Sequence, residues 1–417
     1  MESTNTQREL ALDVLRKLRD AGYETYWAGG CVRDQLLGIA PKDYDVATGA
    51  TPEQVRELFG KRRTLAVGAQ FGVIAVLGKK GHDPIEVATF RSDGAYVDGR
   101  RPAEVVFTTA EEDAERRDFT INGMFLDPLA DNEEEQVVDY VGGREDLQQR
   151  TIRAIGDPHE RFEEDKLRLL RAVRFAACYD FELDPVTRDA INEMANQVTV
   201  VSAERIGAEL KRLLTHDNRA RGVKLLAETR LLAATLPELA NLPAEQSNWQ
   251  SLLEVLSYLE TQSLPTVLAA LLAGTVTPLE SKAICRRLRL TNQEGDQTAW
   301  LLAQLPLIDQ AEALSWPKLQ RILTAPGSEE LMQLASATWP ADHRGLGRCQ
   351  ELLQLPPEQL NPPSLVSGDD LISHGIAPGK HFSTLLEFLR DEQLEGRLHT
   401  LADSLTAADQ WIARHQP

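Results

Sequence analysis

Residues 27–34 read WAGGCVRD, and residues 42–47 read KDYDVA a few positions later. The first segment predicts a strand that turns through Gly29 and Gly30 into a helix. Glycine lets backbone N–H groups approach a ligand closely, and the start of a helix favours anions. Arg33 adds a guanidinium one turn into that helix. The pattern indicates a cradle for phosphate groups, although a Gly-Gly pair alone is also typical of ordinary tight turns.

Asp43 and Asp45 supply two carboxylates two positions apart. On an extended strand such side chains point to the same face, so both carboxylates would meet at one point. Paired carboxylates of this kind are ligands for Mg²⁺. A lone Asp-x-Asp is more often a polar strand edge, but the order and spacing of the Gly-Gly turn and this pair together favour a metal-dependent nucleotide site.

Glu86 offers a third carboxylate, because it lies between apolar neighbours on a predicted strand. A metal-supporting, catalytic role is one interpretation of this residue. The other is a glutamate on an edge strand that faces water.

Residues 111–122, EEDAERRDFTIN, carry an Arg-Asp pair into an apolar segment. Arg117 could grip phosphate or ribose. Asp118 and Asn122 could bind sugar hydroxyls or hold Arg117 in place. A surface cluster of ion pairs fits the same pattern equally well.

Residues 164–176, EDKLRLLRAVRFA, predict a helix with an apolar stripe on one side. Asp165, Arg168, Arg171 and Arg174 recur every third residue, so each is a neighbour of the next. Such residues are usually helix ion pairs. They could also read a base, since a carboxylate accepts from an exocyclic amine and a guanidinium donates to the adjacent ring acceptor. Cytosine and adenine offer that edge, whereas uracil and guanine do not.

The distribution of strand and helix signals predicts an α/β or α+β unit for the first part of the chain, and α+β is the fold class that we expect for the whole. Short strands are expected at residues 26–28, 44–47, 73–77, 85–90 and 104–107. From about residue 157 the strand signals fade and helical segments punctuated by proline take over. A proline-rich break at residues 355–363 precedes a last helical module. We expect an N-terminal unit of residues 1–150 and helical segments at 151–215, 216–355 and 364–417.

The composition is that of a globular protein, with 417 residues, 42% hydrophobic and 26% charged. The net charge of −19 counts against a nucleic-acid partner as a global property, but basic clusters occur locally. We expect a cytoplasmic location and no membrane partner, since no apolar run is long enough to span a bilayer. Four scattered cysteines support neither a disulfide framework nor a zinc site.

The order of these motifs resembles that of the class II tRNA nucleotidyltransferase and bacterial poly(A) polymerase superfamily. The resemblance rests on Gly29-Gly30-x-x-Arg33, Asp43-x-Asp45, Arg116-Arg117-Asp118-Phe119-Thr120-Ile121-Asn122 and Glu164-Asp165-x-x-Arg168. It continues through residues 139–147 and 168–175, and so covers roughly the first half of the chain. Two departures are Gly123, where Ala is commoner, and Lys166, where Pro or a small residue is frequent.

The resemblance implies a polymerase-β-like head with a mixed sheet, followed by all-helical neck, body and tail domains. It implies that Asp43 and Asp45 bind Mg²⁺, and that Gly30, Arg33 and Arg117 contact the incoming nucleotide. Asp165 and Arg168 would act as an amino-acid template for C and A, with Arg171 and Arg174 as supporting contacts. Residues 91–102 resemble a flexible loop that A addition requires, and residues 365–396 resemble a tRNA-handling tail.

The function expected on this basis is addition of CMP and AMP, from CTP and ATP, to the 3′ end of tRNA. We expect no DNA partner. Three alternatives stay open: an enzyme that adds only the terminal A, a poly(A) polymerase, and a non-catalytic RNA-binding protein on the same fold. Both aspartates are present, which disfavours the last alternative.

Overall fold

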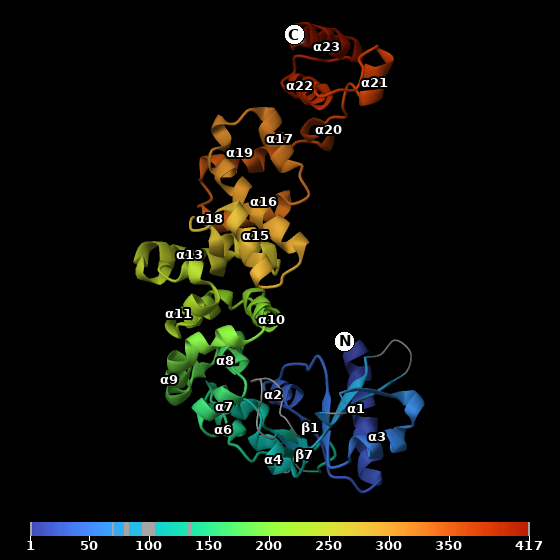
Figure 1. The fold of residues 1–417 in the computed structure, drawn as a ribbon, viewed down its shortest axis with the longest axis vertical. Helices are drawn as coiled ribbons and strands as arrows, with labels where there is room; N and C mark the ends of the chain where they lie inside the picture. The colour runs from blue at the N-terminus through green and yellow to red at the C-terminus, as the bar shows by residue number, and fades with distance from the viewer. Residues whose placement is uncertain (1, 69–70, 79–82, 94–104, 132–135, 416–417) are drawn as a thin grey trace. The chain divides into compact units, whose positions relative to one another are not determined.

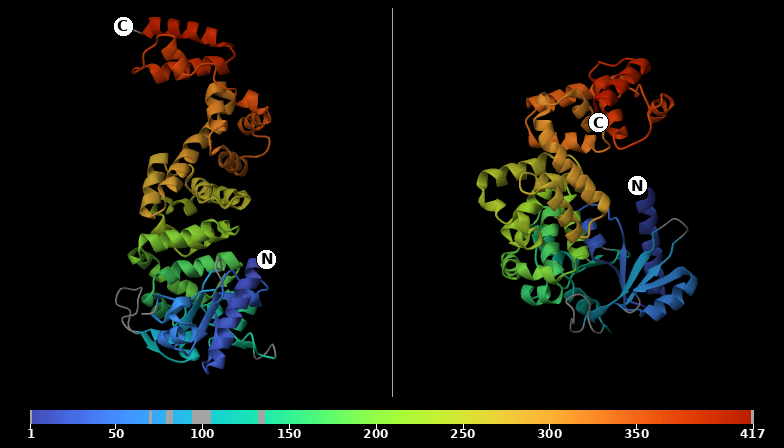
Figure 2. Two further views of the ribbon diagram at one scale, coloured as in Figure 1. Left: turned by 90° about the vertical axis from the view of Figure 1, so that its right-hand side faces the viewer. Right: turned by 45° about the horizontal axis from the view of Figure 1, so that its top comes forward.

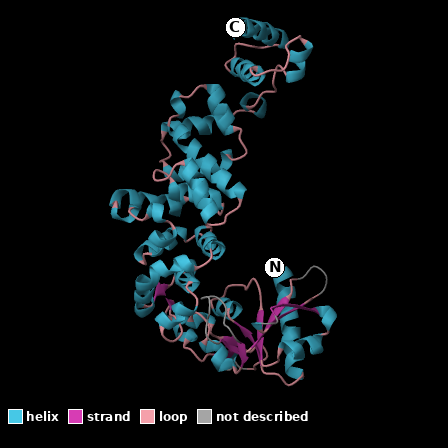
Figure 3. Cartoon of the chain, viewed as in Figure 1, coloured by secondary structure: helices cyan, strands magenta, loops and turns pink. Residues whose placement is uncertain are grey.

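The computed structural model describes residues 2–68, 71–78, 83–93, 105–131 and 136–415. The chain divides into two compact units, residues 1–249 and 250–417. All strands of the described residues belong to the first unit, and helices form the second (Figure 3). The predicted α+β head followed by helical segments is therefore confirmed.

A seven-stranded mixed sheet forms the core of the N-terminal unit, in the order β3-β4-β5-β2-β1-β8-β9. Figure 1 labels β1 of this sheet beside α1 (Glu2–Asp20). Its strands are β1 (Thr25–Ala28), β2 (Asp45–Thr48), β3 (Thr64–Gly68), β4 (Val73–Val76), β5 (Ile85–Thr89), β8 (Phe125–Leu126) and β9 (Val137–Val138). β2 and β5 pair in parallel, and the other neighbours are antiparallel. Two small two-stranded sheets pair β6 (Arg91–Asp93) with β7 (Val105–Phe107), and β10 (Thr151–Ile152) with β11 (Glu182–Leu183).

Four predicted strands, at residues 26–28, 44–47, 73–77 and 85–90, correspond to β1, β2, β4 and β5. Their predicted ends agree with the structure to within one residue. The fifth, at 104–107, corresponds to β7, and Glu104 lies outside the described residues. Most of the predicted loop at 91–102 also lies outside them.

The two faces of the sheet are covered by different helices. The Arg8 guanidinium of α1 (Glu2–Asp20) lies 5.5 Å from the centre of the Trp27 ring. On the opposite face, Ala28 and Phe90 pack with α4 (Ala110–Glu115). Asp45, the first residue of β2, pairs in register with Ala28, so its side chain lies on the same face as α4.

Helices occupy the rest of the N-terminal unit. They are α2 (Gly30–Leu36), α3 (Pro52–Phe59), α6 (Gly143–Gln148), α7 (Pro158–Glu164), α8 (Leu167–Tyr179), α9 (Pro185–Met194), α10 (Ala203–Leu214), α11 (Arg219–Glu228) and α12 (Leu231–Thr235). α8 packs against both α10 and α11, and Figure 2 shows these helices in green. The predicted helix at 164–176 corresponds to the end of α7 and most of α8.

The second unit is helical throughout its described residues, and α13 (Gln246–Tyr258) spans the boundary between the units. The other helices are α14 (Leu264–Leu272), α15 (Pro278–Arg287), α16 (Asn292–Asp309), α17 (Trp316–Leu323), α18 (Ser328–Thr338), α19 (Arg344–Leu353), α20 (Pro357–Leu360), α21 (Gly368–Ser373), α22 (Phe382–Leu394) and α23 (Leu401–His415). α21 to α23 share a hydrophobic cluster around Leu371, Leu385 and Leu389.

All four cysteines are free thiols, and Cys31, Cys285 and Cys349 are buried. None of the described helices has the length and apolarity that a membrane crossing requires.

Candidate active site

A cleft of about 640 Å³ opens in the N-terminal unit between the sheet, α2 and α8. Residues from five separate stretches of the chain line it. They are Gly29, Gly30, Arg33, Asp43, Asp45, Arg116, Arg117, Asp118, Asn122, Asp165, Leu167, Arg168, Arg171, Phe175 and Arg205. The fold thus gathers eleven of the thirteen predicted site residues around one cavity. Among the described residues, Glu86 and Arg174 lie outside this lining.

The Gly-Gly turn joins β1 to α2 as the sequence predicts. Gly29 caps the helix with φ +71°, a conformation that side chains other than glycine rarely adopt. A Cβ at this position would also lie only 3.1 Å from Nη1 of Arg117. Both constraints require glycine where the arginine crosses the turn.

Arg33 is buried beside the turn and is fixed on several sides. Its Nη1 donates to Oδ1 of Asn122 at 2.6 Å, and its Nε and Nη2 donate to Asp34 at 2.9 and 2.8 Å. The guanidinium carbon lies 4.4 Å from the centre of the Tyr179 ring. These contacts hold a positive charge near the start of the helix, where it would attract a phosphate.

Asp43 precedes β2 and Asp45 begins it, and both line the cleft. Burial, together with the negative charges of Asp43 and Glu86, raises the pKa of Asp45 to about 6 against the lowering effect of Arg117. Carboxylates that repel one another in this way are stabilised by a cation placed between them. The donor chemistry therefore fits a divalent metal ion.

Glu86 lies on β5, which is an interior strand and not an edge. Its side chain is exposed to solvent, and its charge acts on Asp45 from the neighbouring strand. Within the described ranges, no group of three or more His, Cys, Asp and Glu side chains is arranged to hold a metal ion. A direct ligand role for Glu86 stays a prediction.

The second group of predicted residues is organised by a buried acid that the sequence did not single out. Asp113 of α4 accepts from Arg116 at 2.7 Å and from Arg117 at 2.9 Å through different carboxylate oxygens. Burial by itself would raise the pKa of Asp113, but the two arginines hold it below its usual value. Arg117 also donates to the backbone oxygen of Asn122 at 3.3 Å, which keeps it over the Gly-Gly turn.

Asp118 links this group to α8. It accepts from Arg171 at 2.5 and 2.9 Å and from Nδ2 of Asn122 at 3.0 Å. Burial by itself would raise the pKa of Asp118, but Arg171, Asn122 and Arg168 lower it to about 2. The sequence pattern of residues 111–122 is equally compatible with a surface cluster of ion pairs. For Asp118 that interpretation is wrong, because its side chain is only 10% exposed.

Each predicted base-reading residue has an oppositely charged partner. Arg168 donates to Glu164 at 2.5 Å and to the backbone oxygen of Arg161 at 2.8 Å. Asp165 accepts from Arg205 of α10. Arg174 donates to the buried Glu209 of α10 at 2.5 Å, behind the cleft wall. The acid and the arginine predicted to read a base both face the cleft, whereas Arg174 supports the helix that carries them.

Four cleft residues were outside the predicted set: Arg116, Leu167, Phe175 and Arg205. Arg116 and Phe175 stand inside the motifs already quoted. For Arg205 the only local signal is its spacing of four from Glu209 on one helix, which is common on solvated surfaces.

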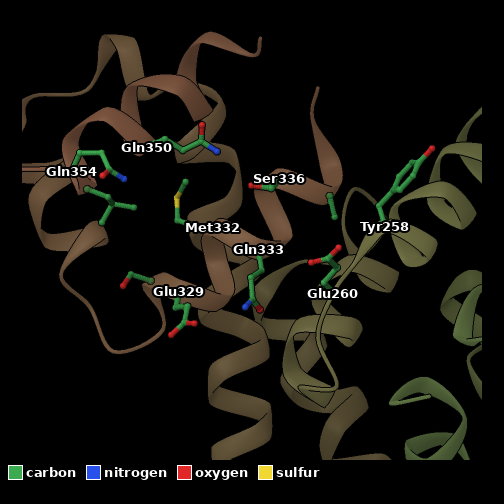
Figure 4. A pocket seen from close by; sticks show the side chains of 11 residues that line it. Tyr258, Glu260, Glu329, Met332, Gln333, Ser336, Gln350 and Gln354 are labelled. Atoms are coloured by element: carbon green, nitrogen blue, oxygen red, sulfur yellow. The ribbon is translucent and has the colours of Figure 1, made fainter. Parts of the chain in front are cut away.

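A second cavity, of about 730 Å³, lies in the C-terminal unit between α13, α18 and α19 (Figure 4). Tyr258, Glu260, Glu329 and Met332 are among its lining residues, with several glutamines. Its lining holds two glutamates but no aspartate, arginine or glycine, so its chemistry differs from that of the cleft.

Comparison with known proteins gives concordant results. Residues 25–153 match the family described as the poly A polymerase head domain, and residues 180–242 match one described as a probable RNA and SrmB binding site of polymerase A. The CCA-adding enzyme of Lacticaseibacillus paracasei is 32% identical over 413 residues, covering 95% of both chains. That of Levilactobacillus brevis is 34% identical over 416 residues, covering 98% of this chain and 99% of the relative.

Solved structures agree with the sequence matches. The Bacillus stearothermophilus CCA-adding enzyme in complex with CTP covers both chains completely, with a TM-score of 0.77 and 28% identity. The Thermotoga maritima CCA-adding enzyme complexed with tRNA has a TM-score of 0.65 at 21% identity, covering 97% of this chain and 95% of that one, which is a likeness of fold.

Proposed function

This chain belongs to the family of CCA-adding enzymes, and on that premise we propose that it builds or repairs the CCA end of tRNA. It transfers CMP and AMP from CTP and ATP to the RNA 3′ end and releases pyrophosphate, without a nucleic-acid template. The observation that carries the proposal is that Asp43 and Asp45 line the same cleft as Asp165 and Arg168. A reacting phosphate and its base can therefore be held by one cavity.

Mg²⁺ is the metal proposed for Asp43 and Asp45, because burial and the neighbouring carboxylates raise the pKa of Asp45, and a cation would stabilise its ionised form. When bound there, Mg²⁺ would activate the RNA 3′-hydroxyl and neutralise charge on the departing pyrophosphate. Glu86 would act on the site through its charge.

The triphosphate is assigned to the Gly-Gly turn. The backbone at Gly29 and Gly30 leaves room for phosphate oxygens, and Arg33 and Arg117 flank the turn with two guanidinium groups. Phosphoryl transfer depends mainly on positioning and charge. Arg33 and Arg117 supply both, because their side chains are held in place and carry positive charge. Asn122 and Asp118 keep those arginines and Arg171 in place.

Base selection is assigned to Asp165 and Arg168. An ionised carboxylate only accepts hydrogen bonds, so Asp165 favours an exocyclic amine at its position. Arg168 only donates, so it favours the neighbouring ring nitrogen or carbonyl. Cytosine and adenine satisfy both residues, whereas uracil and guanine present a carbonyl where Asp165 needs a donor.

The binding of the tRNA body is assigned to residues outside the cleft, because the cleft residues are already assigned to the nucleotide. We propose that residues 151–215 complete the nucleotide site, that 216–355 form a body, and that the module at 364–417 binds tRNA. Recognition through RNA shape and phosphates fits a chain with scattered basic residues. A cytoplasmic location agrees with this substrate.

The test uses tRNA transcripts that end before the CCA, after one C and after both. Purified protein with Mg²⁺ is given CTP, ATP or both, and product lengths are read on a sequencing gel. Completion of CCA from all three transcripts, followed by arrest, supports the proposal. A single A added only to the CC-ended transcript indicates an A-adding enzyme, and unlimited A tails indicate a poly(A) polymerase. Asp43→Ala with Asp45→Ala is the inactive control.

A further inference from the structure

Asp165, the acid assigned to base reading, forms an ion pair with Arg205, 40 positions further along the chain. Nη1 of Arg205 donates to Oδ1 of Asp165 at 3.1 Å, and Nη2 donates to Oδ2 at 2.6 Å. This is the two-pronged geometry that fixes the plane of a carboxylate as well as its place. Both side chains are largely shielded, with 23% of Arg205 and 17% of Asp165 exposed.

The two oxygens of Asp165 are used unequally. Oδ1 also accepts the backbone N–H of Leu167 at 3.0 Å, which marks the start of α8. Each carboxylate oxygen has about two acceptor directions. Oδ1 has a partner in both, whereas the described contacts give Oδ2 one partner. Oδ2 is therefore the atom with capacity for an amine from the cleft.

Arg168 does not share this support, because it is positioned by Glu164 and by backbone oxygens. The acceptor and the donor of the base-reading pair are thus oriented by separate residues. Arg205 orients the acceptor from α10, and the same helix carries Glu209, which orients Arg174.

We propose that Arg205 is a specificity-positioning residue, which holds Asp165 so that Oδ2 accepts the exocyclic amine of cytosine or adenine. The inference rests on the proposed function and deepens it. Without the guanidinium, the carboxylate can rotate about its side-chain bonds or turn toward Arg168. The cleft then loses the fixed acceptor that disfavours a carbonyl, so uracil and guanine are excluded less strongly.

The experiment compares Arg205→Gln and Arg205→Lys with wild type, using full-length protein and tRNA transcripts. Values of kcat and KM are measured separately for CTP, UTP, ATP and GTP. We expect Arg205→Gln to lower the CTP-to-UTP ratio of kcat/KM by about 10- to 100-fold, the scale of a lost charge-assisted hydrogen bond. Arg205→Lys keeps the charge without the fork, and should give an intermediate ratio.

Two controls separate positioning from general damage. Arg221→Gln breaks an ion pair with Glu182, 2.7 Å long in the same unit and outside the cleft, and should leave the ratio unchanged. In an Asp165→Asn background, Arg205→Gln should have no further effect on the ratio, because the acceptor it positions has already been replaced. Thermal unfolding shows whether each variant is folded. If Arg205→Gln does not fold, the CTP-to-UTP ratio of Arg205→Lys is the test of the proposal.

The inference is overturned if the folded Arg205 variants lower kcat/KM for all four nucleotides by the same factor. It is also overturned if Arg205→Gln changes the ratio equally with and without Asp165. Failure of the proposed function looks different, because wild type itself would then add no CMP or AMP.

Discussion

Asp118 is an acid in the arginine-lined wall of the cleft, where it pairs with Arg171. The pKa of its side chain is lowered to about 2 from an ordinary value of 3.8. Because the folded value is the lower one, ionised Asp118 stabilises the fold at neutral pH. That contribution is complete above about pH 4 and is lost as the pH falls from about 4 toward 2.

We therefore expect Asp118→Asn to lower the free energy of unfolding at pH 7 by about 2 kcal/mol. Urea denaturation at pH 7 and at pH 3.5 measures the difference from wild type, which should be smaller at the lower pH. The exposed Asp13, whose nearest approach to Arg16 is 4.0 Å, provides the control Asp13→Asn with almost no change. An equal difference at both pH values would contradict this account of Asp118.

Gly123, at which the sequence departs from the family pattern, is closely surrounded by its neighbours. A Cβ at this position would lie 2.6 Å from Cγ2 of Val141 and 3.1 Å from Cδ1 of Ile155. The backbone itself accepts alanine, since φ is −88°. The restriction is therefore steric, and Val141 is a stiff, β-branched side chain that cannot easily move aside.

We expect Gly123→Ala to destabilise the protein by about 1–3 kcal/mol through overpacking. The double variant Gly123→Ala with Val141→Ala should recover part of that loss, because the second change removes the clashing methyl group. Urea unfolding of the four proteins in the cycle gives the coupling energy. Additive effects of the two changes would show that Val141 is not the obstacle.

At the scale of single residues, the sequence predicted which side chains face the cleft better than which side chains hold them in place. Glycine, paired aspartates and the Asp-Arg motif have local patterns that can be read directly. Asp113 and Arg205 act through contacts that only the fold creates. Asp113 looks like one of several acids in an exposed run, and Arg205 meets Asp165 only because α10 packs on α8.

At the scale of elements, α7 has the cap that decides where the base-reading segment begins. Asp157 accepts from the backbone N–H groups of His159 and Glu160 at 2.8 and 3.1 Å, and Pro158 follows it. The helix ends at Glu164, directly before Asp165. Its start and end together fix the position of the acid that faces the cleft.

We expect Asp157→Ala to cost about 1 kcal/mol of unfolding free energy, since two N–H groups lose their acceptor. Asp157→Asn should cost much less, because its side-chain oxygen can still accept. Chemical denaturation of both variants measures the difference. Equal losses for alanine and asparagine would indicate that the cap does not stabilise α7.

The strands also differ in how well the sequence predicted them. β1, β2, β4 and β5 are apolar runs bounded by turn residues, and their signals are strong. No comparable signal marks β8 and β9, which are two residues long and depend on pairing with β1 and with each other. β3 carries exposed Leu65 and pairs through an irregular register, so its alternation is weak.

At the scale of the whole molecule, every residue assigned to nucleotide binding lies in the N-terminal unit. A fragment of residues 1–245, which ends before α13, should therefore fold and bind CTP and ATP with affinities close to those of the full chain. Isothermal titration calorimetry measures both, with Arg33→Ala in the fragment as a weakened control. A folded fragment without nucleotide affinity would place an essential part of the site in the C-terminal unit.

The central claim is that side chains of the protein choose C and A without a template. The most direct measurement gives full-length protein, Mg²⁺ and all four nucleoside triphosphates at equal concentration to a tRNA transcript that lacks the CCA, and sequences the products. We expect tRNA ending in CCA with no further extension. Products that contain U or G in these positions, tails of A without limit, or no extension at all would contradict it.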